Sequence, residues 1–128
     1  MIAITRGTAN TVTVTATELI TLTSPNFLFR FTNEATGTQN SCIASNTSSY
    51  TRRYDRFVIT ESTTEDRVNG TLKLLYAGFW KYEIFEQASA TELNVTTQNL
   101  VEEGICQVTD SSIVNTWIEN NVGDTYVE

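Results

Sequence analysis

Acidic residues are the side chains of this sequence best suited to catalysis, because the chain contains no histidine. Histidine is the commonest general acid or base near neutral pH and the commonest metal ligand, so an enzyme built from this chain would have to work through carboxylates. Paired carboxylates would indicate glycoside hydrolysis. The acids of the second half include Glu61, Glu65, Asp66, Glu83, Glu86, Glu102 and Glu103. No spacing singles out a pair among them, so we predict no catalytic residue and expect a protein that is not an enzyme.

Patterns that bind metals or cofactors are not found in the sequence either. No segment spaces oxygen ligands as a calcium loop does, and there is no glycine-rich phosphate loop. The two cysteines, Cys42 and Cys106, have no histidine partner for nucleophilic catalysis. They could form a disulfide if their strands face each other, but a cytoplasmic product more often keeps such residues as small buried apolar side chains. The sequence predicts no metal site and no cofactor.

One polar stretch combines arginine with tyrosine, since residues 51–57 read TRRYDRF. It could bind nucleic acid or a sugar, but a surface loop or a cationic patch that meets an acidic face of a neighbouring subunit fits a chain of net charge −7 better. Arginine and tyrosine are enriched at the energetic centres of protein–protein interfaces. The candidate interaction residues are Arg52, Arg53, Tyr54 and Arg56, with Trp117 near the C-terminus.

Charge is distributed unevenly along the chain. Residues 1–60 carry five arginines against three acids, whereas residues 61–128 carry twelve acids against three basic side chains. Phosphate binding needs clustered cations, so we expect no nucleic-acid partner. Opposite charge in the two halves could let copies pack head to tail, and the simpler alternative is an acidic surface that keeps the protein soluble.

Membrane insertion is not expected. No apolar run approaches the roughly 18–20 residues of a membrane span. The first ten residues turn polar too early for a signal peptide. We therefore expect no membrane partner and a protein that is made in the cytoplasm.

The dominant hydrophobic period is two residues, which is typical of strands. The expected strands are residues 2–5, 11–16, 27–33, 40–45, 56–61, 71–76, 79–87 and 100–108, with an irregular edge segment at 18–23. A bulge at Gly104 would divide the last of these into two short strands. Residues 113–118 could form a further strand or a pair of helical turns.

Aromatic residues are expected to build the core from two of these strands. Alternation places Phe27, Phe29 and Phe31 on one face of the first strand, and Trp80 and Tyr82 on one face of the second. The short Ala77-Gly78 turn predicts an antiparallel hairpin between residues 71–76 and 79–87. On the opposite face, Lys81 and Glu83 are expected to be salt partners rather than an acid and a base.

These elements predict an all-β fold. About seven to nine short strands separated by turn signals indicate an antiparallel β-sandwich, immunoglobulin-like or jelly-roll-like. We expect the sandwich to span residues 1–109. Residues 110–128 would then be a C-terminal extension, either a last strand or a tail that docks on a partner.

Three segments together resemble a known family. They are the opening MIAITRGTANTVTVTATELITLTSPNFLFRFTNEATG, the later NGTLKLLYAGFWKYEIFEQASATEL, and LVEEGICQV. This pattern is similar to that of a family of small proteins encoded by tailed bacteriophages of Bacteroidetes-type hosts, crAss-like phages included. The similarity covers about residues 1–108 and rests on residues of structural type.

The resemblance implies a virion component with a β-sandwich fold and no enzymatic activity. It would be associated with the capsid as an auxiliary, decoration or head-fibre protein, or else belong to the tail or neck. Its partners would be other virion proteins, such as the major capsid protein, and further copies of itself in a homo-oligomer. It would be made in the host cytoplasm and located in the virion. The alternative of a different class is a carbohydrate-binding module, which would need Trp80, Tyr82 or Trp117 on an exposed platform.

Overall fold

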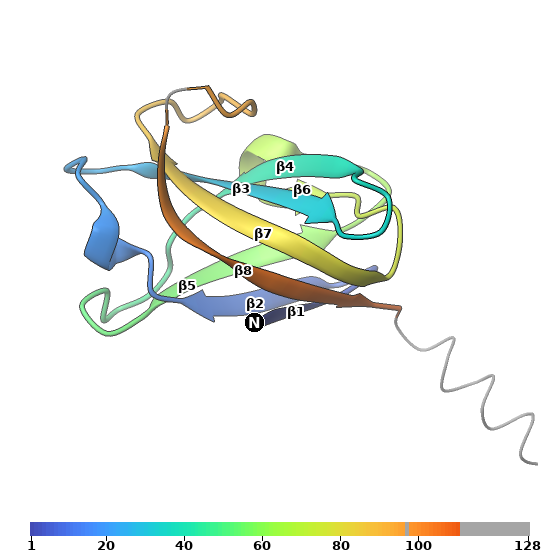
Figure 1. Ribbon diagram of the computed structural model, residues 1–128. Helices are drawn as coiled ribbons and strands as arrows, with labels where there is room; N and C mark the ends of the chain where they lie inside the picture. Colours follow the sequence, from blue (N-terminus) through green and yellow to red (C-terminus); the bar gives the residue numbers. More distant parts are fainter. Residues whose placement is uncertain (97, 111–128) are drawn as a thin grey trace, which may run out of the picture.

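Two β-sheets pack face to face in the computed structural model, which describes residues 1–96 and 98–110 (Figure 1). The larger sheet, sheet A, has the order β1-β8-β7-β3-β4, and sheet B has the order β2-β5-β6. The predicted all-β sandwich is confirmed. The strands are β1 (Ile2–Thr5), β2 (Ala9–Val14), β3 (Asn26–Asn33), β4 (Gln39–Ala44), β5 (Asp55–Glu61), β6 (Thr71–Leu72), β7 (Gly78–Gln87) and β8 (Asn99–Thr109), with the short 3-10 helices η1 (Thr17–Leu19) and η2 (Arg67–Asn69).

The chain crosses between the sheets after β1, β2, β4 and β6, as immunoglobulin-like Greek-key sandwiches do. The central ladders of sheet A are antiparallel, and so is the β2–β5 ladder of sheet B. Two edge pairings are parallel, with Ile2 opposite Cys106 in β1–β8 and Thr60 opposite Thr71 in β5–β6. The first strand of the chain is therefore fixed by the last.

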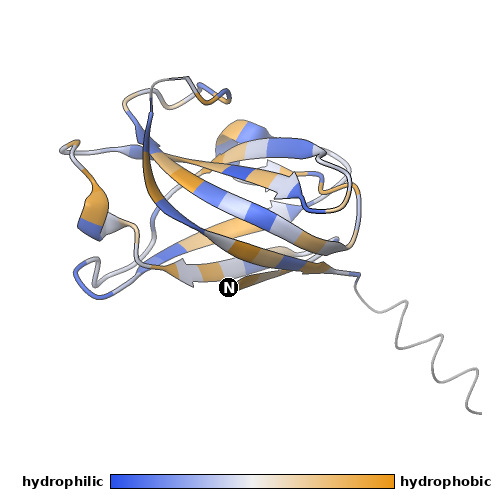
Figure 2. Ribbon diagram, viewed as in Figure 1, coloured by the Kyte–Doolittle hydropathy of each residue, from blue (hydrophilic) through white to orange (hydrophobic). Residues whose placement is uncertain are grey.

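The core lies between the sheets and is aromatic at its centre. All five predicted core aromatics are buried, namely Phe27, Phe29, Phe31, Trp80 and Tyr82. The ring of Phe57, from sheet B, meets those of Phe27 and Phe29 edge-on at centroid distances of 5.3 and 4.9 Å. Figure 2 shows the alternation of apolar and polar residues along β7 and β8 that places one face of each strand in this core.

The predicted hairpin between residues 71–76 and 79–87 is wrong. β6 contains only Thr71 and Leu72 and pairs with β5, whereas β7 lies between β3 and β8. Residues 73–77 leave the sheet because Leu74 turns its backbone N–H to Glu61 of sheet B, at 3.0 Å. The indole N–H of Trp80 then donates to the Tyr76 carbonyl at 2.9 Å, which holds this connection against the start of β7.

Two further local expectations have different outcomes. Residues 18–23, expected as an irregular edge segment, belong to no strand, because η1 begins at Thr17 and the chain then runs without regular structure. β8 is one continuous strand, which confirms one of the two alternatives, and its irregularity lies opposite Ile84 and Phe85 rather than at Gly104. Gly104 instead leaves room for a ring, since a Cβ there would lie 2.9 Å from the Tyr82 hydroxyl. The predicted extension, apart from Asp110, lies outside the described residues.

Cys42 and Cys106 are both free and buried, as interpreted from the sequence. β7 and β3 lie between their strands in sheet A. Burial raises the pKa of each thiol to about 12, so neither is a nucleophile near neutral pH. Among the described residues there is also no helix long and apolar enough to cross a membrane.

The outer face of sheet A has a charged centre and a covered end. Arg30 donates to Glu83 at 2.8 Å, while Lys81 lies 4.0 Å from Glu83, so the predicted Lys81–Glu83 contact is present but is the weaker one. Beside these ion pairs, Leu28, Ile43 and Phe85 form a second small apolar cluster under residues 93 and 95 of the β7–β8 loop.

A candidate interaction surface on the β4–β5 loop

The arginine- and tyrosine-rich stretch forms the loop of residues 45–54 and the start of β5. Its backbone turns back on itself at Tyr50, whose carbonyl accepts the N–H groups of Arg53 and Tyr54 at 2.9 and 3.1 Å. Asn46 supports the turn from below, because its side-chain oxygen accepts the N–H groups of Ser48 and Arg56. The loop thus has a defined conformation before any partner binds.

A buried carboxylate anchors this loop to the sandwich. Asp55 has no exposed surface, and it begins β5 on the face that points into the core. It accepts the backbone N–H groups of Ala16 and Thr17 at 2.6 and 2.8 Å, the Thr17 hydroxyl, and the Asn46 amide. These bonds compensate the cost of burying a carboxylate, and they fix the loop relative to η1.

Above that anchor, the arginines and tyrosines gather on one exposed surface, which we call the Arg/Tyr surface: Tyr50, Arg52, Arg53, Tyr54 and Arg56. Tyr50 is 63% exposed, and its ring centroid lies 6.4 Å from that of Tyr54. The Arg56 guanidinium lies 5.3 Å over the Tyr54 ring, a cation–π contact. Tyr50, Arg53 and Tyr54 line a shallow open hollow.

The Arg/Tyr surface carries positive charge without an internal counterion. The ion pairs of the described residues involve Arg6, Arg30 and Lys81, and none involves Arg52, Arg53 or Arg56. The chain as a whole is acidic, with net charge −7. The structure therefore brings the four sequence-predicted residues Arg52, Arg53, Tyr54 and Arg56 together and adds Tyr50, which the sequence analysis missed. Its spacing of four from Tyr54 across a turn was the available signal.

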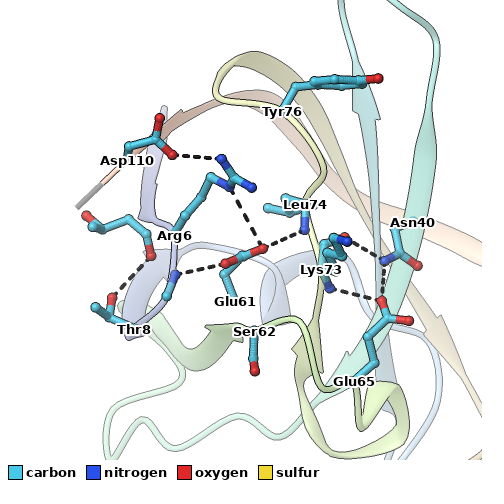
Figure 3. A network of polar contacts seen from close by, with 12 residues as sticks. Arg6, Thr8, Asn40, Glu61, Ser62, Glu65, Lys73, Leu74, Tyr76 and Asp110 are labelled. Carbon is cyan, nitrogen blue, oxygen red and sulfur yellow. Dashed lines mark hydrogen bonds and ion pairs between the residues drawn. The ribbon is translucent and has the colours of Figure 1, made fainter. Parts of the chain in front are cut away.

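Carboxylates that could have been catalytic hold loops in place. Glu61, at the other end of β5, accepts the Gly7 N–H at 2.8 Å and the Leu74 N–H at 3.0 Å, and Arg6 lies 4.0 Å away (Figure 3). Arg6 forms its close ion pair, at 2.7 Å, with Asp110. Glu61 therefore joins three connections at one end of the sandwich, and its oxygens are occupied by this chain.

Glu86, on β7, also holds a loop of its own chain in place. Its carboxylate is 2% exposed at the side of an open hollow and accepts the backbone N–H of Thr21 at 2.8 Å. Burial raises the pKa of Glu86, but the hydrogen bonds from the Thr21 hydroxyl and from the N–H groups of Thr21 and Leu22 outweigh that effect and lower the pKa overall. A general acid would need a raised pKa, so the direction of this shift argues against that role for Glu86.

The exposed aromatic platform expected of a sugar-binding module is not formed by Trp80 and Tyr82, which are 0% and 3% exposed. Trp117, the remaining member of that platform and of the candidate interaction set, lies outside the described residues. Within the described ranges there is no group of three side chains that could hold a metal ion.

Comparison with known proteins assigns this chain to no family. No family model matches the chain, and no curated protein matches its sequence. One solved structure that is similar is described as a "putative glycoside hydrolase" from Bacteroides vulgatus, with a TM-score of 0.46 and 9% identity. The match covers 90% of this chain and 17% of that protein, so this chain spans about a sixth of its length. A likeness at that level carries no argument about activity.

Proposed function

We propose that this protein is a non-enzymatic structural component of a bacteriophage virion, associated with the capsid as an auxiliary, decoration or head-fibre protein. It acts through protein–protein contacts. The observation that carries the proposal is the Arg/Tyr surface, where three arginines that form no ion pair with any described residue lie beside two tyrosines on a loop anchored by Asp55. The proposed location in the virion rests on the resemblance of residues 1–108 to a phage protein family.

The chemistry of the partner follows from the charge of this surface. Its arginines can form bidentate hydrogen bonds with carboxylates, and its tyrosines offer rigid apolar area at low entropic cost. The complement is an acidic patch on a neighbouring virion protein. A single contact of this size is weak, but many copies on a particle bind by avidity.

The occupied carboxylates support a structural role over a catalytic one. Asp55, Glu61 and Glu86 accept N–H groups of their own chain and hold loops, so removing their charge would loosen the fold before it affected any reaction. A carbohydrate-binding role has lost its main support, because Trp80 is buried.

Purified phage particles provide the direct test. Mass spectrometry should find this chain in intact particles at a stoichiometric level, and particles stripped of tails should retain it. Absence from particles, with accumulation in infected cells, would overturn the proposal. Retention in isolated tails only would place it in the tail or neck instead.

The Arg/Tyr surface is tested by adding purified protein to particles that lack it. Arg53→Glu should reduce co-sedimentation at least tenfold, since it puts an acid against the acidic partner. Lys73→Glu is the matched control, because Lys73 is exposed, forms no ion pair with a described residue, and undergoes the same change of charge. Equal loss in both variants would show that net charge matters and the surface does not. Glycan-array binding by a monomer would favour the carbohydrate module.

A further inference from the structure

Each β-sheet ends in two edge strands, and three of the four edges here are protected against pairing with another chain. The β4 edge is covered by residues 65–73, with Arg67 Nε donating to the Ser41 carbonyl at 2.8 Å. β6 is only two residues long. β1 is four residues long, and the Asn10 side chain bonds both the N–H and the carbonyl of Thr5. Short strands and covering side chains are the usual protection of an edge.

The fourth edge, on β2, is open. Glu61 donates its N–H to the Thr8 carbonyl at 3.0 Å, and the register places Ala9 opposite Thr60. Residues of an antiparallel pair alternate between bonding across the ladder and pointing away from it, so Ala9, Thr11 and Thr13 direct their N–H and carbonyl groups outward. These groups form no hydrogen bond with any residue that the structure describes.

β2 also lacks the sequence features that discourage pairing. It contains no proline, no charged residue and no bulge. The uncharged stretch is longer than the strand, since residues 7–17 contain no acid and no base. Thr11 and Thr13 are exposed beside Val58, which is 44% exposed on the same outer face of sheet B. A flat β-branched edge of this kind is a template for strand addition.

We propose that β2 pairs with β2 of a second copy of this chain, antiparallel about a two-fold axis. The pairing is centred on Thr11, which opposes Thr11 of the second copy, so that Ala9 opposes Thr13. All three outward-facing residues of each strand then form hydrogen-bonded pairs. The two copies of sheet B join into one six-stranded sheet, and the Arg/Tyr surfaces lie outside this contact, so the inference does not depend on the proposed function.

Charge selects a second copy as the occupant. Two chains of net charge −7 repel each other over most of their surfaces, but along residues 7–17 neither copy brings a charge to the contact. A nucleic acid or an acidic peptide would find no cation on this edge. The edge is also complementary to itself, because the pairing sets the small exposed side chains of Ala9 and Thr13 opposite each other and Thr11 opposite Thr11, and a two-fold axis makes one surface serve as both partners.

Sedimentation equilibrium of the full-length protein tests the proposal across a range of concentrations. The wild-type chain should pass from 14.3 kDa to twice that mass as concentration rises. Hydrogen exchange at the Thr11 and Thr13 amides should slow in the same range, because these N–H groups gain partners only in the dimer.

Two variants at one position report on the edge. Thr11→Pro removes an outward N–H without removing a ladder bond, and Thr11→Lys places two cations opposite each other across the axis. Each should weaken dimerisation at least tenfold, and Thr11→Lys remains informative if proline disturbs the strand. Val58→Lys is the control, since it adds the same charge on the same face one strand further from the two-fold axis. At that distance salt screens the repulsion between the charges of the two copies.

Three results would overturn the proposal. The first is a wild-type chain that stays at 14.3 kDa at the highest concentration reached. The second is equal weakening by Val58→Lys and Thr11→Lys, because the cause would then be general charge. The third is open-ended growth beyond the dimer, because a two-fold contact closes on itself.

Discussion

The two long edge strands of this sandwich, β4 in sheet A and β2 in sheet B, are equal in length, but β4 is covered and β2 is open. β4 is covered by residues 65–73, from which Arg67 donates to the strand, while Asn40 of β4 donates to Glu65 and to the Lys73 carbonyl of the cover. β2 is followed by η1, which carries one acid and touches no outward group of the strand. Of these two edges, only β4 is joined by polar side chains to a covering segment, and that segment follows β5 in the chain.

The cover over β4 should be most sensitive at Gly70. Its φ is +81°, and an added Cβ would lie 3.1 Å from the Val58 carbonyl oxygen. Gly70→Val combines left-handed strain with a backbone clash, so we expect a loss of about 2–5 kcal/mol in the free energy of unfolding, measured by urea denaturation. Gly37→Val has a similar φ of +76° with open space around it. If both substitutions cost the same, the cover is not closely packed at Gly70.

Glu61 connects the two edges, because it binds Gly7 before β2 and Leu74 at the end of the β4 cover. Glu61→Gln retains the shape, but Gly7 and Leu74 donate to different carboxylate oxygens, and the one amide oxygen can accept only one of these N–H groups while the amide N–H₂ faces the other. We expect a loss of about 1.5–3 kcal/mol in the free energy of unfolding and faster hydrogen exchange at the Gly7 or the Leu74 amide, whichever loses its acceptor. Unchanged exchange at both amides would contradict the anchor.

Arg67→Met should open the β4 edge with a smaller cost. The substitution keeps an apolar stem but leaves the Ser41 carbonyl without its donor, which costs about 1–2 kcal/mol. The variant should also self-associate more strongly than wild type in light scattering, because it gains a second open edge. Arg53→Met removes a cation that does not touch an edge, and it should change neither stability nor association.

Acid should loosen the β4 cover, and we expect this effect on stability to be the smallest of the four. The Lys73 backbone N–H and then the Asn40 side chain hold the pKa of Glu65 below its ordinary value of 4.5. A folded-state pKa below the unfolded one contributes stability that is present above about pH 4.5 and is lost as pH falls through the lower, folded value. The protection factor of the Lys73 amide should therefore fall in that window in wild type. In Glu65→Gln it should already be low at neutral pH, and the Val12 amide should be unaffected in both proteins.

The local elements of this fold could be predicted because alternation is a property of neighbouring residues. Phe27, Phe29 and Phe31 lie on the buried face as their spacing indicates, and so do Trp80 and Tyr82. Strand partners depend on residues far apart in sequence, and turn signals mislead about them. Ala77-Gly78 was interpreted as a hairpin turn, but Gly78 begins β7, whose partners are β3 and β8.

The candidate surface was only half predictable for a related reason. The residue types of Arg52, Arg53, Tyr54 and Arg56 indicated an interface, and the loop does present them together. The role of Asp55 was missed. Asp55, Phe57 and Ile59 occupy alternate, inward-facing positions of β5, and the same series ends with Glu61. Charged residues at alternate positions of an apolar face indicate anchors, because only a carboxylate that accepts several N–H groups is tolerated there.

The parallel ladder between β1 and β8 sets an order of events during synthesis. Ile2 pairs beside Cys106, 104 positions later in the chain. At about 5–20 residues per second, a ribosome needs on the order of 5–20 s to make that partner. Until then the apolar side of β1 has no neighbour in its own sheet, and such distant pairing is slow to form even in a finished chain. A polypeptide released before β8 emerges would keep the first strand unpaired. The sandwich can therefore close only after β8 has been synthesised.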